Sequence, residues 1–120
     1  MSLDVTLYKD DMELVVEKLC GIEDNNELYS DNITHNLNRM AMEAGIYEHL
    51  WRPDEINITH AHQLIEPLEH GLKLLKGDPK RFQEFNSPNG WGLYEHFVPF
   101  VRNYLRACKE YPNARVEVSR

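Results

Sequence analysis

Leu-Asp-Val-Thr-Leu-Tyr-Lys, residues 3–9, alternates apolar and polar side chains. A period of two predicts a strand that buries one face. The apolar run over residues 12–19 predicts a second strand, which a tight turn at Asp10 and Asp11 joins to the first. An alternating segment over residues 114–120 predicts a third strand that joins this N-terminal hairpin.

Helical spacing of apolar residues follows the predicted hairpin. The first predicted helix begins at Ile33, with Asp31 or Asn32 as its N-cap. It ends at Gly45, where a left-handed residue commonly terminates a helix. Residues 21–27, which precede it, are acidic and rich in turn formers, and they predict a surface loop.

Three further helices are predicted over residues from about 59 to 77, 79–85 and about 93–111. Together with the strands they define the fold class. We expect an α+β fold in which a small antiparallel sheet, made of the N-terminal hairpin and the C-terminal strand, packs against about four helices. The length fits a single domain over residues 1–120.

Composition excludes several classes of partner. The formal net charge is −7, which disfavours binding to a nucleic-acid polymer, because that binding depends on Lys and Arg displacing counterions. No apolar run approaches the ~20 residues that cross a bilayer, so no membrane partner is expected. The start of the sequence lacks the pattern of a secretory signal, which predicts a cytoplasmic location. Cys20 and Cys108 are too few for a disulfide framework or a thiolate metal site.

The start of the first predicted helix is crowded with hydrogen-bonding residues, Thr34, His35, Asn36 and Arg39. A helix N-terminus presents unpaired N–H groups and a positive dipole end, so it attracts a phosphate or carboxylate. The alternative is that Thr34, His35 and Asn36 only cap the helix.

Two tryptophan segments offer a second set of candidate ligand-binding residues. Trp51 supplies an indole for stacking, and Arg52 supplies a guanidinium that can pair with a phosphate bidentately. The segment "NGWGLY" places Trp91 between two glycines, with Asn89 and Tyr94 beside it. These groups suit a nucleobase-containing ligand. Alternatively, both tryptophans are core anchors and the glycines only shape a turn.

Evidence for catalysis is weaker. His62, Glu66 and His70 share one side of the second helix, a spacing that can place two ligands near one metal ion, but the same residues fit a solvated polar face. His35 could act as a general base, yet no nucleophile in a recognisable context lies near it in the sequence. We therefore predict no catalytic residue, no metal ligand and no cofactor.

Several motifs resemble a family of small, largely uncharacterised phage and bacterial proteins. They are "ITHNL", "MA" followed by "AGIY", "LWRP", "LIEPLEHGL", "NGWGLY", "YLRAC" and "VEVSR". The second "NITH", at residues 57–60, is not part of this pattern. The resemblance implies a compact protein and a viral setting, and it directs attention to residues 33–36, 50–53 and 89–94. Phage proteins of this size often counter bacterial immunity.

Three functions follow from these observations. In the first, the protein is a homo-oligomer that sequesters a small nucleotide-derived signal of the cyclic-nucleotide or ADP-ribose type, without catalysis, in the cytoplasm of a bacterial host. In the second, it is a protein-protein inhibitor of a bacterial defence enzyme, and its acidic surface docks on a basic groove. In the third, it is a metal- or His-dependent hydrolase of a nucleotide.

Overall fold

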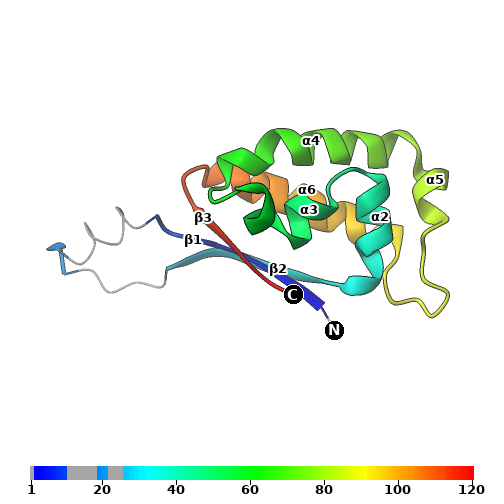
Figure 1. The fold of residues 1–120 in the computed structure, drawn as a ribbon, viewed down its shortest axis with the longest axis horizontal. Helices are drawn as coiled ribbons and strands as arrows, with labels where there is room; N and C mark the ends of the chain where they lie inside the picture. The colour runs from blue at the N-terminus through cyan, green and yellow to red at the C-terminus, as the bar shows by residue number, and fades with distance from the viewer. Residues whose placement is uncertain (1, 11–18, 22–25) are drawn as a thin grey trace.

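The computed structural model describes residues 2–10, 19–21 and 26–120. Its strands and helices, in chain order, are β1 (Ser2–Tyr8), β2 (Glu27–Thr34), η1 (His35–Leu37), α2 (Asn38–Glu43), α3 (Tyr47–Trp51), η2 (Pro53–Ile56), α4 (His62–Gly77), α5 (Pro79–Gln83), α6 (Tyr94–Glu110) and β3 (Arg115–Ser119). The sheet forms one layer and the helices pack on one of its faces (Figure 1). The predicted α+β fold with a small antiparallel sheet is confirmed.

The sheet has the strand order β2-β1-β3, and both pairings are antiparallel. Val5 at the centre of β1 lies opposite Asp31 on β2 and Val118 on β3. Leu3, Val5 and Leu7 are fully buried, so the alternation in β1 directs its apolar side chains to the helices. β3 confirms the prediction of a C-terminal strand.

The strand that pairs with β1 corrects the sequence analysis. Of the second strand predicted over residues 12–19, residues 12–18 lie outside the described residues, and Leu19 is not in a strand. The observed partner is Glu27–Thr34, which contains the end of the predicted loop, both predicted N-cap residues and the predicted start of the first helix. Asp31 shares the inward side of β2 with Ile33, so a carboxylate interrupts the apolar alternation. Because Asp and Asn are also depleted in strands, the sequence does not signal this strand.

The first helix begins later than predicted. Ile33 belongs to β2, and the N-cap is Thr34, whose hydroxyl accepts a hydrogen bond from the N–H of Asn36 at 3.4 Å. Asp31 and Asn32, the predicted caps, lie in the strand. The predicted end is confirmed, because Gly45 adopts a φ of +76° just beyond α2. The short helices α3 and η2 follow, and the sequence analysis did not predict them.

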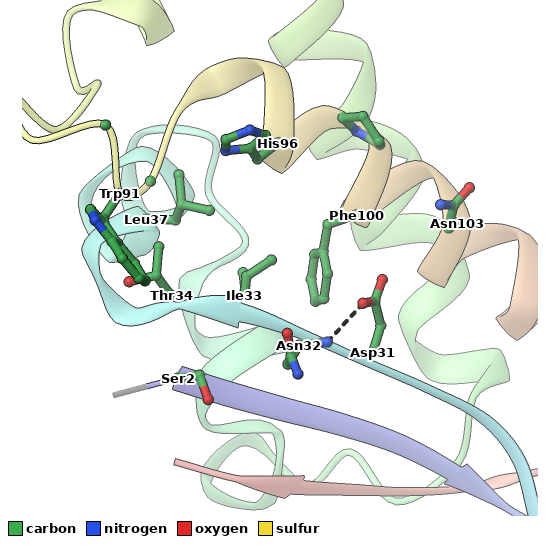
Figure 2. Close-up of a pocket in the computed structure, with 13 residues that line it drawn as sticks. Ser2, Asp31, Asn32, Ile33, Thr34, Leu37, Trp91, His96, Phe100 and Asn103 are labelled. Atoms are coloured by element: carbon green, nitrogen blue, oxygen red, sulfur yellow. Dashed lines mark hydrogen bonds between the residues drawn. The ribbon is translucent and has the colours of Figure 1, made fainter.

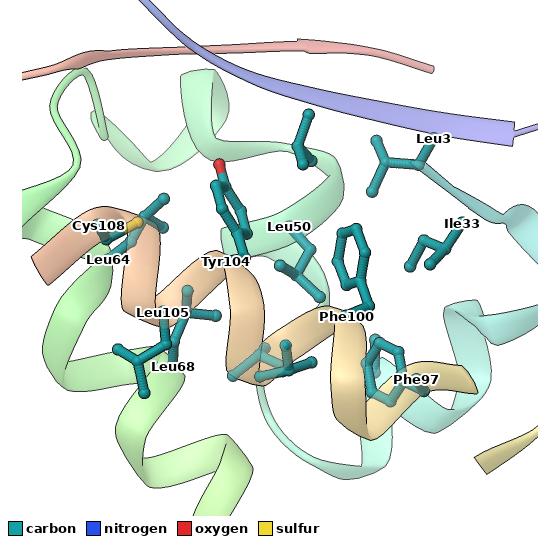
Figure 3. Packing of buried hydrophobic residues seen from close by; sticks show 14 of the residues in the cluster. Leu3, Ile33, Leu50, Leu64, Leu68, Phe97, Phe100, Tyr104, Leu105 and Cys108 are labelled. Carbon is teal, nitrogen blue, oxygen red and sulfur yellow. The ribbon is translucent and has the colours of Figure 1, made fainter. Parts of the chain in front are cut away.

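Helix α6 lies between α4 and the sheet. Figure 3 shows Phe100 and Tyr104 pointing toward the strands, while Leu105 lies beside Leu64 and Leu68 of α4. All five side chains are at most 6% exposed, and each such burial stabilises the fold by roughly 1.5–3 kcal/mol. The N-terminal half of α6 forms one wall of the candidate site through His96, Pro99 and Phe100.

Candidate functional site

The loop over residues 86–92 is held in shape by its own side chains. Asn89 Oδ1 accepts hydrogen bonds from the hydroxyl of Ser87 at 2.6 Å and from the backbone N–H of Trp91 at 2.9 Å. The backbone N–H of Ser87 donates to the carbonyl of Gly92 at 3.1 Å, which closes the loop. Asparagine stabilises turns in this way, by bonding to the backbone two residues further on. The loop therefore presents Trp91 from an ordered backbone.

Gly92 brings this loop against the segment that links β2 to η1. Its φ is +107°, a conformation that L side chains rarely adopt. A Cβ atom at Gly92 would lie 2.9 Å from Cβ of Asn36 and 3.2 Å from Cγ2 of Thr34. In addition, Nδ2 of Asn36 donates to the carbonyl oxygen of Trp91 at 2.9 Å. The structure thus joins two of the sequence motifs, residues 34–36 and the glycine-flanked tryptophan.

A pocket of about 550 Å³ opens between the loop, β2 and α6. Its size is typical of small-molecule sites, which span roughly 300–1,000 Å³. Figure 2 shows Trp91 at one end, Asp31 and Asn103 at the other, and Ile33 and Phe100 between them. The remaining polar residues on its lining are Ser2, Asn32, Thr34 and His96. An apolar floor with polar groups at its edges is the usual composition of a ligand site.

Trp91 is the most exposed aromatic side chain on this pocket. Trp91 is 68% exposed, whereas Ile33 and Phe100, which form the floor of the pocket, are buried. Tryptophan is usually buried in large part, so an indole exposed to solvent at the edge of a pocket is unusual. Such an indole offers a face on which a planar ring can stack.

Trp51 corrects the expectation of two stacking faces. Its side chain is only 2% exposed, and its ring stacks on Tyr47 with centroids 5.4 Å apart. Nε1 of Trp51 donates to Nδ1 of His35 at 2.9 Å. A neutral His35 that accepts at Nδ1 carries its proton on Nε2. Trp51 is therefore a core anchor, as the alternative interpretation held, and His35 satisfies its N–H.

The two arginines expected to pair with phosphates lie away from the pocket lining. Nη1 of Arg52 donates to the carboxylate of Glu55 at 2.7 Å, and Nε of Arg52 donates to the hydroxyl of Tyr47 at 3.2 Å. The hydrogen bond to Glu55 is the main reason that the pKa of Arg52 is raised. Arg39 and His35 line a separate hollow of about 560 Å³. The expected convergence of these cations with both indoles on one cavity is not observed.

Tyr94, the last of the predicted ligand-binding residues, connects α6 to its surroundings. Its hydroxyl donates to the carbonyl of Leu75 at the end of α4, at 2.8 Å. Its backbone N–H donates to Oδ1 of Asn86 at 2.7 Å. The first contact ties the start of α6 to α4 and the second ties it to the loop, so Tyr94 positions the pocket wall. Tyr94 itself is not among the lining residues.

Several lining residues were missed by the sequence analysis, namely Ser2, Asp31, Asn32, His96, Phe100 and Asn103. The sequence holds a direct signal for three of them. His96, Phe100 and Asn103 are spaced i, i+4, i+7, which places them on one face of a helix. Asp31 is recognisable as inward-facing only once residues 27–34 are assigned to a strand.

The three candidate metal ligands on α4 lie near one another but are not arranged as a metal site. His62, Glu66 and His70 all line one open hollow of about 700 Å³. Yet among residues 2–10, 19–21 and 26–120, no three His, Cys, Asp or Glu side chains are arranged to hold a metal ion. The arrangement fits the solvated polar face that was the alternative interpretation of this spacing.

Comparisons with known proteins give no assignment. No protein-family model matches the chain, and neither the curated proteins nor the solved structures contain a match. Within the described parts of the chain, no helix combines the length and apolar character that a membrane crossing requires.

Proposed function

We propose that the protein binds a small nucleotide-type ligand in the pocket beside Trp91 and holds it without converting it. The observation that carries the proposal is an indole 68% exposed at the end of a pocket of about 550 Å³. The ligand's base would stack on this indole. Stacking of a base on an aromatic side chain contributes about 1–3 kcal/mol.

Preorganisation supports the proposal. Asn89 and Asn36 hold the backbone on either side of the indole, through the N–H and the carbonyl of Trp91. A loop that is already ordered loses little conformational freedom when a ligand arrives, so more of the contact energy appears as affinity. A turn that existed only to reverse the chain would not need this exposed indole.

Polar side chains around the pocket complement the stacking face. Asn103 offers an amide that can both donate and accept, and His96 offers a ring nitrogen of either kind. Thr34 lies at the same end as Trp91 (Figure 2). Such groups suit the edge of a heterocycle or the hydroxyls of a ribose.

Sequestration is the physiological role that we propose for this binding. A pocket that captures a base-containing signal lowers its free concentration without any chemical step. The resemblance to small phage proteins is the reason to place this role in evasion of bacterial immunity. A homo-oligomer belongs to the same proposal, and sedimentation of the purified protein tests it directly.

The experiment is calorimetric titration with nucleosides, nucleoside monophosphates, cyclic dinucleotides and ADP-ribose. At least one of these compounds should bind to the wild-type protein, and Trp91→Ala should weaken that binding by roughly 5- to 150-fold, the equivalent of the stacking energy. The matched control is Met42→Ala, because Met42 is an exposed apolar side chain on α2, 53% exposed, and does not line the pocket. If no compound binds, or if both variants weaken binding equally, the proposal is wrong.

The competing functions give different results in two further measurements. Chromatography of the ligand after incubation returns it intact from a capturing protein, whereas a hydrolase yields products. An inhibitor of a host enzyme would instead retain its protein partner in a pull-down and lose it at high salt, and Trp91→Ala would leave that retention unchanged.

A further inference from the structure

The pocket holds a carboxylate where a sheet normally presents an apolar side chain. Inward positions alternate along β2 with a period of two, and Tyr29, Asp31 and Ile33 occupy them, opposite Leu7, Val5 and Leu3 of β1. Tyr29 and Ile33 pack with the core. Asp31 instead lines the pocket, at the end far from Trp91 (Figure 2).

From this placement we infer that Asp31 selects the ligand: the pocket takes a planar heterocycle whose far edge presents two adjacent N–H donors, as the Watson–Crick edge of guanine does. The inference rests on the proposed function, since it assigns the second end of the same pocket. A carboxylate has two oxygens side by side and accepts a pair of parallel N–H donors bidentately.

About half of the acceptor capacity of Asp31 is unused within the described part of the protein. Its Oδ1 accepts the backbone N–H of Asn32 at 2.8 Å, and its Oδ2 accepts the hydroxyl of Tyr29 at the long distance of 3.4 Å. Burial, and next the charge of Asp31, raise the pKa of Tyr29, so its hydroxyl stays protonated and can only donate here. An ionised carboxylate provides about four acceptor positions, so about two remain for a ligand, one on each oxygen.

The charge of the pocket argues for donors and against phosphates at this end. Among the described residues that line it, Asp31 is the sole Asp, Glu, Lys or Arg side chain. A phosphate placed there would face a carboxylate without a compensating cation, and the whole chain already carries a formal net charge of −7. The base edge therefore points toward Asp31, and any phosphate points out of the pocket.

The shape of the pocket agrees with this orientation. Between the indole of Trp91 and the carboxylate of Asp31 lie the apolar side chains of Ile33, Leu37 and Phe100 (Figure 2). In the inferred orientation, a flat ring system stacks on the indole above this floor and directs its donor edge toward the carboxylate. The amide of Asn103, at the same end as Asp31, is available to a carbonyl on that edge.

The test compares guanosine, inosine and adenosine by calorimetric titration. Inosine lacks the exocyclic amino group of guanosine, and adenosine has an acceptor where guanosine has its ring N–H. The wild-type protein should bind guanosine about 10-fold or more tightly than either, because one hydrogen bond to a charged group contributes about 1.5–3 kcal/mol. Asp31→Asn should remove this preference and weaken guanosine binding roughly 10- to 100-fold.

The matched control is Asp4→Asn, because Asp4 is an exposed carboxylate on the neighbouring strand whose side chain lies on the opposite face of the sheet. This variant should keep both the affinity and the preference for guanosine. Should Asp31→Asn fail to fold, the preference of the wild-type protein among the three nucleosides still decides the inference.

The outcomes separate this inference from the proposed function. Equal binding of the three nucleosides, with loss of binding in Trp91→Ala, overturns the role of Asp31 and leaves the stacking site in place. Binding that requires a phosphate group also overturns it, because the anion would then be the recognised feature. If none of the nucleosides or nucleotides binds, both proposals fail.

Discussion

At the scale of single residues, the two indoles of this chain have opposite environments. Trp51 ends a short helix and packs in the core with its N–H bonded to His35, whereas Trp91 stands in solvent on a loop. Each was predicted to stack on a ligand, and only Trp91 has a face available for it. The flanking residues explain the different environments of the two indoles. Trp51 follows a segment that includes Ile46 and Leu50, whereas Trp91 lies between two glycines. A tryptophan between glycines has no neighbouring side chains to bury it.

The bond between Trp51 and His35 gives a prediction about stability. His35→Ala leaves the buried indole N–H without its acceptor, and we expect the free energy of unfolding to fall by about 1–3 kcal/mol. Equilibrium unfolding in urea measures it. Arg39→Ala, a change of an exposed residue on α2, serves as the control and should have little effect.

A double-mutant cycle identifies the cause of that loss. In a Trp51→Phe background no indole N–H remains to be satisfied, so adding His35→Ala should cost less there than it does in the wild-type protein, by at least about 0.5 kcal/mol. An equal cost in both backgrounds would show that the hydrogen bond does not matter and that His35 acts only through packing.

At the scale of elements, segments with a regular spacing of apolar residues were predictable, and segments in which polar residues interrupt that spacing were not. β1, β3, α4 and α6 follow from spacing alone, because each buries one continuous apolar face. β2 was missed because Asp31 occupies an inward position and Asn32 lies next to it. The residue that hides the strand from sequence analysis is the same residue that we assign to ligand selection. Departures from a local pattern of this kind are expected where a site is built into a fold.

The loop that carries Trp91 gives a prediction at the same scale. Gly92→Ala should destabilise the protein by more than the roughly 1–2 kcal/mol that a positive φ costs an L residue, because its Cβ would also lie 2.9 Å from Cβ of Asn36. Displacement of the loop should also weaken ligand binding. Urea unfolding and the calorimetric titration described above measure the two effects.

Gly90→Ala is the control for Gly92→Ala. Gly90 also has a positive φ, +79°, so an alanine there meets a conformational cost of the same kind, but a Cβ at this position has no neighbour within 4 Å. The larger loss expected for Gly92→Ala then reflects the close contact with residues 34–36 together with the greater departure of its φ, +107°, from the left-handed region. Equal losses would mean that the loop does not depend on this contact.

At the scale of the whole molecule, sequence patterns predicted the fold class and the third strand but not how the candidate residues converge. Convergence depends on which loop reaches which strand, and no local spacing encodes that. Residues 34–36 and the glycine-flanked Trp91 do meet, through the hydrogen bond from Asn36. Arg39 does not join them, because on α2 it lines a separate hollow, and Arg52, between α3 and η2, pairs with Glu55 instead. Side-chain direction on short helices was the information that the sequence lacked.

The pairing of β1 with both β2 and β3 has a kinetic consequence. Val5 contacts Val118, so the central strand is completed only by a segment from the opposite end of the described chain. Closing so long a loop costs entropy before any contact compensates for it, which slows folding and favours late docking of β3. We expect Val116→Ala to accelerate unfolding in stopped-flow experiments while refolding proceeds at nearly its original rate. A refolding rate that falls as far as the stability would instead place β3 in the folding nucleus. The half-life of the folded protein would then be governed by how firmly this final strand stays docked.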